Sequence, residues 1–352
     1  MSLDTLLGLI QPSDRRLLFQ AKSRLDRLTK PQGSLGRLEE LAAQYVMISG
    51  ELKPTVPRGM VFTFAADHGV AMEGVSAYPR EVTAQMVLNF LRGGAGVNVL
   101  ARHVGMAVRV VDIGVAHEFG TVPELIQKKV MFGTKNFLCE PAMSREEAEQ
   151  AVTVGAEMAT LAVQEGIGMI GTGDMGIGNT TPSAAITSVM TGRPVAEVTG
   201  RGTGIDDAAH VRKISVIQRA LDLHRPDRTD PLDVLAKVGG LEIGGLAGLI
   251  LGAAAARVPV ILDGFIAGAA ALIAVGLQAL CRDYLIASHR SVERGHQVIL
   301  DHLGVKPLLD LDLRLGEGTG ACLGMSLVCA AIKIFTDMAT FDEAGVSERG
   351  SL

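Results

Sequence analysis

A single carboxylate stands at the centre of a glycine-rich loop near the end of the chain. The loop runs Gly316-Glu317-Gly318-Thr319-Gly320, between an alternating apolar stretch at 308–315 and an apolar run of helical length. This pattern predicts a strand, a loop and a helix, the unit that places ligands at the carboxyl end of a parallel sheet. A glutamate beside bound phosphate would repel it. Glu317 is therefore predicted to take up a proton, with a pKa raised by the surrounding loop and Leu315.

A second glycine-rich loop, residues 171–181, has the composition of a phosphate site. Its glycines allow close backbone approach, and Asn179, Thr180 and Thr181 add donors where a helix is predicted to begin, with Pro182 in its first turn. This suits a phosphate or ribose phosphate at a helix N-terminus. A glycine turn with a good helix cap is the alternative. The loop lacks both the Walker A ending and the GxGxxG spacing, which disfavours an NAD-dependent dehydrogenase.

A third glycine-rich segment, residues 199–207, precedes a predicted helix that contains Lys213. Lys213 could meet a phosphate held by the 171–181 loop, although most helical lysines are simply solvated. The proximity of the two loops in the sequence favours the phosphate role.

Other polar residues follow predicted strands. Asp67-His68 ends one strand, Asp263-Gly264 ends another, and residues 287–291 form a polar island after a third. The eight histidines form no HxH or HxxxH pattern and the chain has no GxSxG elbow, which disfavours a metal hydrolase. Asp67 and His68 are predicted to shape a loop by hydrogen bonding, and Asp263 to border a ligand crevice.

The elements that position these loops alternate between strands and helices. Strands are predicted at 61–69, 106–115, 166–179, 258–265 and 308–315, with a short one near 285–288. Helical patterns follow them, which indicates a three-layer α/β/α arrangement with a mostly parallel, Rossmann-like sheet. Residues 1–50 are predicted to be helical, with a break at 30–33.

Composition narrows the function. Hydrophobic residues make up 48% of the 352, aromatics only 4%, and there are 42 glycines, so the interior is built from small aliphatic residues. The net charge of −5 offers no broad cationic surface for nucleic acid. The four cysteines form no CxxC pair, which favours reduced, buried thiols in the cytoplasm. The amino-terminal residues lack the pattern of a signal peptide.

Two apolar segments, 243–256 and 265–281, could be mistaken for a membrane hairpin. Arg257 and Asp263 interrupt the region, and neither segment gives about twenty clean apolar residues. Buried helices and a strand are the prediction, with no membrane span.

Nine motifs in order resemble the nicotinate-nucleotide:dimethylbenzimidazole phosphoribosyltransferase family. The resemblance covers residues 20–340 and rests on TKPQGSLGRLE (29–39), AADHGV (65–70), GVSAYPREVTAQMV (74–87), GGAGVNVLAR (93–102), GDMGIGNTT (173–181), TGRGTGIDD (199–207), LDGFIAGAAAL (262–272), SHRSVERGH (288–296) and LRLGEGTGA (313–321).

This resemblance implies transfer of phosphoribosyl from nicotinate mononucleotide to 5,6-dimethylbenzimidazole, in assembly of the cobalamin nucleotide loop. It implies a cytoplasmic homodimer that needs no metal or cofactor. It also implies a helical small domain formed by residues 1–60 with about 335–352, beside an α/β catalytic domain over 61–334.

The resemblance assigns the base and the substrate contacts to particular residues. Glu317 would be the catalytic base. The aromatic pocket would be lined by Ser76, Tyr78, Gln85, Met175 and Leu315. Ribose and phosphate would be held by Gly176, Asn179, Thr180, Gly202, Gly204 and Lys213, with Asp263, Gly264 and Ser291 nearby.

One position departs from the family pattern. The 173–181 motif carries Asp174 where the family has Glu, which keeps the charge but shortens the reach by one methylene. The acceptor could therefore be dimethylbenzimidazole, another benzimidazole, adenine or a phenol. A non-catalytic nucleotide-binding protein on the same scaffold is a further alternative.

Overall fold

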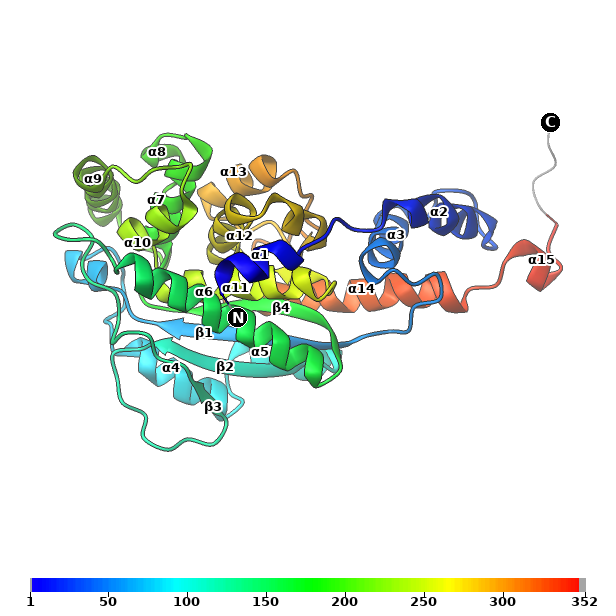
Figure 1. The fold of residues 1–352 in the computed structure, drawn as a ribbon, viewed down its shortest axis with the longest axis horizontal. Helices are drawn as coiled ribbons and strands as arrows, with labels where there is room; N and C mark the ends of the chain where they lie inside the picture. Colours follow the sequence, from blue (N-terminus) through cyan, green and yellow to red (C-terminus); the bar gives the residue numbers. More distant parts are fainter. Residues whose placement is uncertain (1, 348–352) are drawn as a thin grey trace.

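The computed structural model describes residues 2–347 and is built around six parallel strands (Figure 1). The strands are β1 (Arg58–Ala66), β2 (Ala107–Gly114), β3 (Leu125–Gln127), β4 (Ile167–Met175), β5 (Val260–Leu262) and β6 (Leu285–Ala287). Their order in the sheet is β3-β2-β1-β4-β5-β6, and every pair is parallel. The chain direction across the sheet reverses between β1 and β4, which is where such sheets bind ligands. The predicted α/β class is confirmed.

Helices cover both faces of the sheet because the side chains of β1 alternate between two cores. Phe62 and Phe64 belong to the core formed with the upper helices of Figure 1, while Val61 and Ala65 belong to a second core on the other face of the sheet. The upper layer consists of α1 (Leu3–Leu9), α6 (Arg145–Gln164), α7 (Thr180–Thr191), α8 (Val195–Val198), α9 (Asp207–His224), α10 (Pro231–Val238), α11 (Leu241–Ala255), α12 (Phe265–Leu277) and α13 (Arg294–Leu303).

The other layer contains α4 (Val82–Leu91), α5 (Gly96–Val104) and α14 (Thr319–Asp337). At one end of the molecule α2 (Leu18–Arg27) and α3 (Arg37–Ser49) lie beside α14, and α15 (Phe341–Ala344) follows it (Figure 1). An antiparallel bridge joins Leu28, which follows α2, to Thr340, which precedes α15. The first helix, α1, packs instead on α6 and α11. The proposed two-domain division stays a prediction, and residues 348–352 lie outside the described part.

Small residues allow the closest helix packing. A Cβ placed on Gly155 of α6 would lie 1.8 Å from the carbonyl oxygen of Gly245, and one on Gly248 of α11 would lie 1.8 Å from that of Val152. The backbones of α6 and α11 therefore touch directly. This contact explains why a chain so rich in glycine and so poor in aromatics still forms a close-packed interior. It also confirms that 243–256 is a buried helix.

The predicted strand at 308–315 is wrong. Only Leu308 and Leu309 donate backbone hydrogen bonds to the end of β6, at Ala287 and Ser288, and the rest of the segment is irregular. Asp312 adopts a left-handed conformation (φ +54°) and Leu311 is 52% exposed, so the alternation of leucines does not mark a buried face. The short strand β3 was not predicted, since three residues carry too little periodicity.

The cysteine prediction is correct in part. Cys281 and Cys322 are buried and Cys329 is half-buried, but Cys139 is exposed because it lies in a turn that precedes α6. All four are free thiols.

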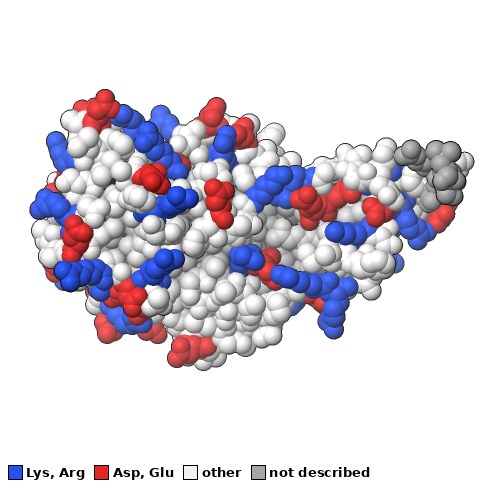
Figure 2. All heavy atoms as spheres, turned by 90° about the horizontal axis from the view of Figure 1, so that it is seen from above, with Lys and Arg blue, Asp and Glu red and all other residues white. Residues whose placement is uncertain are grey.

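Helix α14 has the length and hydropathy of a membrane span, but it packs against α3, α5 and β4 (Figure 1). Charges of both signs are interspersed over the face shown in Figure 2.

Candidate active site

The Glu317 loop lies on β1 and β4, where the sheet order reverses. The hydroxyl of Thr63, on β1, donates to the carbonyl oxygen of Glu317 at 2.9 Å. A Cβ on Gly173 of β4 would lie 2.2 Å from the same oxygen. Only glycine at position 173 therefore lets the loop sit this close to the sheet. Glu317 itself is in the left-handed region, with φ +64°.

The Glu317 carboxylate points to the start of α5. Its Oε2 accepts a hydrogen bond from the backbone N–H of Val97 at 3.1 Å, and the side chain is almost fully buried. Burial raises the pKa of Glu317, while the N–H groups of Val97 and Gly96 oppose part of that rise. A carboxylate of raised pKa is suited to accept a proton near neutral pH.

Two further carboxylates lie near this loop, and with Glu317 they form what we call the carboxylate half of the site. Asp174 is the penultimate residue of β4, accepts from Asn179 Nδ2 at 2.9 Å, and has no partner for its Oδ1 among the described residues. Asp263 follows β5 and accepts three backbone N–H groups of the Glu317 loop and α14. Burial raises the pKa of Asp263 to about 7. Burial, and then the charge of Asp263, raise the pKa of Asp174 well above its usual range.

A lysine half lies at the start of α7. Lys213 is fully buried on α9, and its ammonium donates to Thr180 Oγ1 at 2.6 Å. Burial lowers the pKa of Lys213 to about 8, although the charge of Glu293 opposes that shift. The N–H of Gly202 donates to Glu293 Oε1 at 2.9 Å. A buried cation, a hydroxyl and a glycine loop are gathered here, as a phosphate site requires.

The two halves are joined by short links. Asn179, the N-cap of α7, reaches back to Asp174, and Arg314 donates to the carbonyl oxygen of Gly202 at 3.3 Å. The carboxylate of Asp174 also lies against Gly316. The structure thus brings together residues that are up to 254 positions apart, from Thr63 to Glu317.

Most other predicted residues lie around these two halves. Met175 and Gly176 follow Asp174, and Gly176 is packed against the carbonyl oxygen of Ala66 and the ring of His68. Gly264 is the N-cap of α12 and lies near His289 and Ser291.

The remaining predicted residues are more exposed. Leu315 is 59% exposed and touches Gly96, so it covers the Glu317 carboxylate less than the sequence suggests. Ser76 lies within 3.4 Å of Thr203 on the third glycine loop, which also contains Gly204. Tyr78 is 56% exposed.

Gln85 has no hydrogen bond to either half among the described residues. It is exposed on α4 and lines a pocket of about 360 Å³ with Asp67, Arg80 and His117. Asp67 shapes this region as predicted, because its Oδ2 accepts from the N–H of Ala116 at 2.8 Å.

Sequence reasoning missed three residues in or behind the site. Thr63 lies inside a strand and Glu242 inside an apolar helix, and neither belongs to a sequence motif that indicates a functional residue. Glu242 is fully buried and pairs with His68 at 2.9 Å, behind Gly176. Glu293 could have been proposed from the sequence, since it lies in the 288–296 motif that contributes to the family resemblance.

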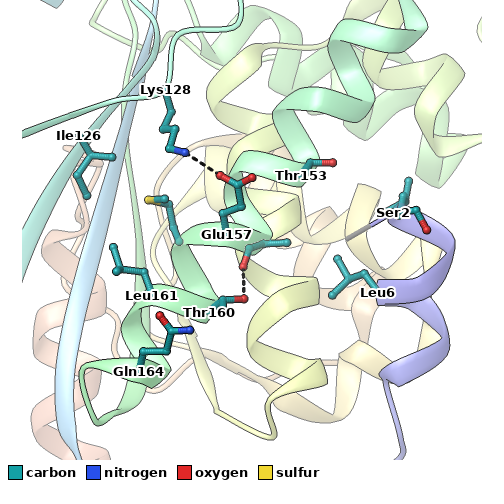
Figure 3. Close-up of a pocket in the computed structure, with 12 residues that line it drawn as sticks. Ser2, Leu6, Ile126, Lys128, Thr153, Glu157, Thr160, Leu161 and Gln164 are labelled. Carbon is teal, nitrogen blue, oxygen red and sulfur yellow. Dashed lines mark hydrogen bonds and ion pairs between the residues drawn. The ribbon is translucent and has the colours of Figure 1, made fainter.

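A larger pocket, of about 580 Å³, lies elsewhere between α1, β3 and α6 (Figure 3). Its wall is mostly apolar and includes Leu6, Ile126 and Leu161, with the Lys128–Glu157 ion pair of 2.9 Å at one side. None of the predicted site residues lines it.

Comparison with known proteins agrees with this geometry. A phosphoribosyltransferase family model matches residues 10–346. The nicotinate-nucleotide–dimethylbenzimidazole phosphoribosyltransferase of Geobacter sulfurreducens is 61% identical over 342 residues, 97% of either chain. The enzyme of the same name from Chloroflexus aggregans is 62% identical over 340 residues, 97% of this chain and 96% of that one.

The chain belongs to the nicotinate-nucleotide–dimethylbenzimidazole phosphoribosyltransferase family. The crystal structure of CobT from Thermus thermophilus superposes with a TM-score of 0.92 at 49% identity, covering 95% of this chain and 100% of the other. The family predicted from the nine motifs is confirmed.

Proposed function

We propose that this protein transfers the phosphoribosyl group of nicotinate mononucleotide to 5,6-dimethylbenzimidazole, giving α-ribazole 5′-phosphate and nicotinate. The observation that carries the proposal is full-length identity of about 60% to relatives that bear this name. The buried carboxylate of Glu317 and the buried ammonium of Lys213 would supply the two chemical functions that the reaction needs: a base and a phosphate-binding cation.

The reaction is a displacement at C1′ of the ribose. A ring nitrogen of the acceptor attacks C1′ as the bond to the nicotinate nitrogen breaks, and the bond electrons neutralise the departing pyridinium. Attack from the opposite face converts a β- into an α-glycoside through an oxocarbenium-like transition state. The other acceptor nitrogen loses its proton to Glu317, whose pKa is raised by burial. No cofactor or metal is required, because the leaving group is already cationic.

The lysine half would hold the nucleotide. Lys213 and Thr180, which are hydrogen-bonded to each other and lie against Gly202 of the 199–207 loop, would contact the 5′-phosphate. Asn179 and the backbone at Gly176 would border the ribose, with Gly264 and Ser291 beside them. Tyr78, Met175 and Leu315 would contact the flat acceptor.

The test is incubation of purified protein with both substrates, with nicotinate and ribotide followed by chromatography and mass. Base-dependent nicotinate release with an α-ribotide product is expected. Nucleotide binding without release, for any acceptor, would instead support a non-catalytic nucleotide-binding protein.

A different acceptor is the second candidate, favoured by the shorter side chain of Asp174. Its buried Oδ1 has no hydrogen-bond partner among the described residues, and a donor group of a phosphoribosyl acceptor or of a water would satisfy it. The same assay with adenine, other benzimidazoles and phenols ranks the acceptors.

We also propose that the protein acts as a homodimer in the cytoplasm, with only small-molecule substrates as ligands. The exposed apolar side chains of Leu315 and Tyr78 on the site side would be partly covered by a partner subunit. Light scattering on the purified protein tests the dimer, and a monomer that retains full activity would exclude a requirement for it.

A further inference from the structure

Asp263 contacts the backbone of the loop that carries Glu317. The N–H of Gly318 donates to Oδ2 at 3.2 Å, and those of Gly320 and Ala321 donate to Oδ1 at 2.7 and 3.1 Å. The side chain is fully buried. Both carboxylate oxygens are therefore engaged by residues that immediately follow Glu317, which leaves little capacity for a substrate.

The loop needs support from another element. Glu317 has φ +64° and Gly318 has φ +103°, and a non-glycine residue stays in this region only where its surroundings fix it. Gly318 is the N-cap of α14 and has no side chain with which to satisfy the first N–H groups of that helix. Asp263, 55 residues earlier in the chain and at the end of β5, takes over this capping role.

The glycines of the loop fit this contact. A Cβ on Gly320 would lie 2.9 Å from Asp263 Oδ1 and 2.0 Å from His289 Nδ1. A side chain at position 320 would therefore push α14 away from the carboxylate. Glycine at this position thus allows α14 to approach both His289 and Asp263, and the His289 contact is the closer of the two.

Thr63 holds the same loop from the opposite side. Its hydroxyl donates to the carbonyl oxygen of Glu317 at 2.9 Å, and the side chain is fully buried on β1. Asp263 thus binds N–H groups after Glu317 while Thr63 binds the carbonyl of Glu317 itself. Together they fix the peptide groups on the carboxyl side of Glu317, from which its own side chain projects to Val97.

We infer that Asp263, together with Thr63, is a positioning residue that fixes the Glu317 carboxylate for proton transfer, and that Asp263 is not a substrate ligand. The inference rests on the proposed function, since it assigns a role within that reaction. It gives a specific role to a residue that the sequence predicts only to border the ligand crevice, near the groups that hold ribose and phosphate.

The experiment measures kcat, KM for each substrate and Kd for nicotinate mononucleotide in Asp263→Asn and Thr63→Val. Asparagine places an N–H₂ group against a backbone N–H, so the loop shifts. A displacement of this kind costs roughly 100-fold in kcat. Thr63→Val loses one hydrogen bond and about tenfold in kcat. The Kd for nicotinate mononucleotide stays within about twofold in both variants, because neither residue binds it.

A double-mutant cycle with Glu317→Gln separates positioning from an independent role. If Asp263 and Thr63 act through Glu317, each substitution lowers the residual rate of Glu317→Gln by less than about twofold. Multiplicative losses in that background would overturn the inference. So would a large rise in Kd for nicotinate mononucleotide with kcat unchanged, which would make Asp263 a substrate ligand.

Matched controls address loss of stability. Asp112→Asn alters another fully buried carboxylate, within β2, which accepts from Val115 N–H at 2.9 Å and pairs with Lys129. Thr187→Val removes another buried hydroxyl that donates to a carbonyl, that of Ser183. Both are expected to lower the unfolding temperature and to retain kcat. If Asp263→Asn fails to fold, the kinetics of Thr63→Val and its double-mutant cycle with Glu317→Gln still test whether the loop positions Glu317. Absence of nicotinate release by the wild-type protein would refute the proposed function instead.

Discussion

Burial acts in opposite directions on the two halves of the site. In the carboxylate half it raises the pKa values of Glu317, Asp174 and Asp263. In the lysine half it lowers the pKa of Lys213 to about 8. In both cases the low-dielectric interior disfavours the charged form. Burial alone therefore makes Glu317 a stronger base than an ordinary glutamate and makes Lys213 a stronger acid than an ordinary lysine.

The two halves also differ in how they are held. Glu317 is fixed by groups from β1, β5 and α5, directly or through its loop. Lys213 makes one hydrogen bond, to Thr180, and Glu293 Oε2 beside it has no partner among the described residues. Under the proposed function, the carboxylate half would be preorganised for a proton transfer, while the lysine half would keep donor capacity for the nucleotide.

The largest expected effect comes from Glu317→Gln. The amide keeps the shape but cannot take the acceptor proton, so kcat falls by roughly 10²- to 10⁴-fold, the usual contribution of a general base. The Kd for nicotinate mononucleotide is expected to stay near that of the wild type. Steady-state kinetics and calorimetry check both. An equal loss of binding and rate would show that Glu317 holds substrate.

Lys213→Met tests the other half and should give the opposite pattern. Removal of a charged hydrogen-bond donor to phosphate raises KM and Kd for nicotinate mononucleotide by about 10- to 100-fold, with a smaller change in kcat. Arg219→Met is the matched control, because it removes one positive charge from an exposed position of the same helix. A similar KM for both variants would exclude a phosphate role for Lys213.

The sequence predicts the lysine half better than the support of the carboxylate half. Thr180 and Lys213 can be found from the sequence, because each lies in or after a glycine-rich loop that precedes a helix, a pattern typical of anion sites. Asp263 was assigned to the right crevice, since it directly follows a strand. Its hydrogen bonds to α14 could not be predicted, because they depend on how closely β5 and α14 approach. The strand predicted before Glu317 failed because leucine alternation does not reveal that Leu311 faces solvent.

The pH profile of kcat/KM should report the titration of both Glu317 and Lys213. A raised pKa means that the Glu317 carboxylate is lost as pH falls, starting at a higher pH than for an ordinary glutamate. Asp174 and Asp263 titrate with it as a coupled group. A pKa of about 8 means that Lys213 loses its charge above that pH, so affinity for the nucleotide declines. The profile is therefore expected to be bell-shaped.

Lys213→Arg sharpens this test. Arginine stays protonated throughout the accessible range, so the alkaline limb should move upward or disappear while the acid limb stays in place. An alkaline limb that remains near pH 8 in this variant would assign it to another group. Buffers of constant ionic strength are needed, because phosphate recognition depends on salt.

The smallest expected effect is on acceptor choice, through Asp174→Glu. The substitution restores the longer side chain of the family pattern in a crevice where the carboxylate already lies against Gly316. We expect kcat/KM for dimethylbenzimidazole, relative to adenine and to phenol, to rise by at most about tenfold, the lower end of what one methylene changes in a pocket. Competition assays with paired acceptors measure this ratio directly.

Because Asp174 is joined to the lysine half through Asn179, KM for nicotinate mononucleotide must be followed in parallel. A change confined to that KM, with the acceptor ratio constant, would place Asp174 with the nucleotide rather than with the acceptor, and so move the boundary between the two halves.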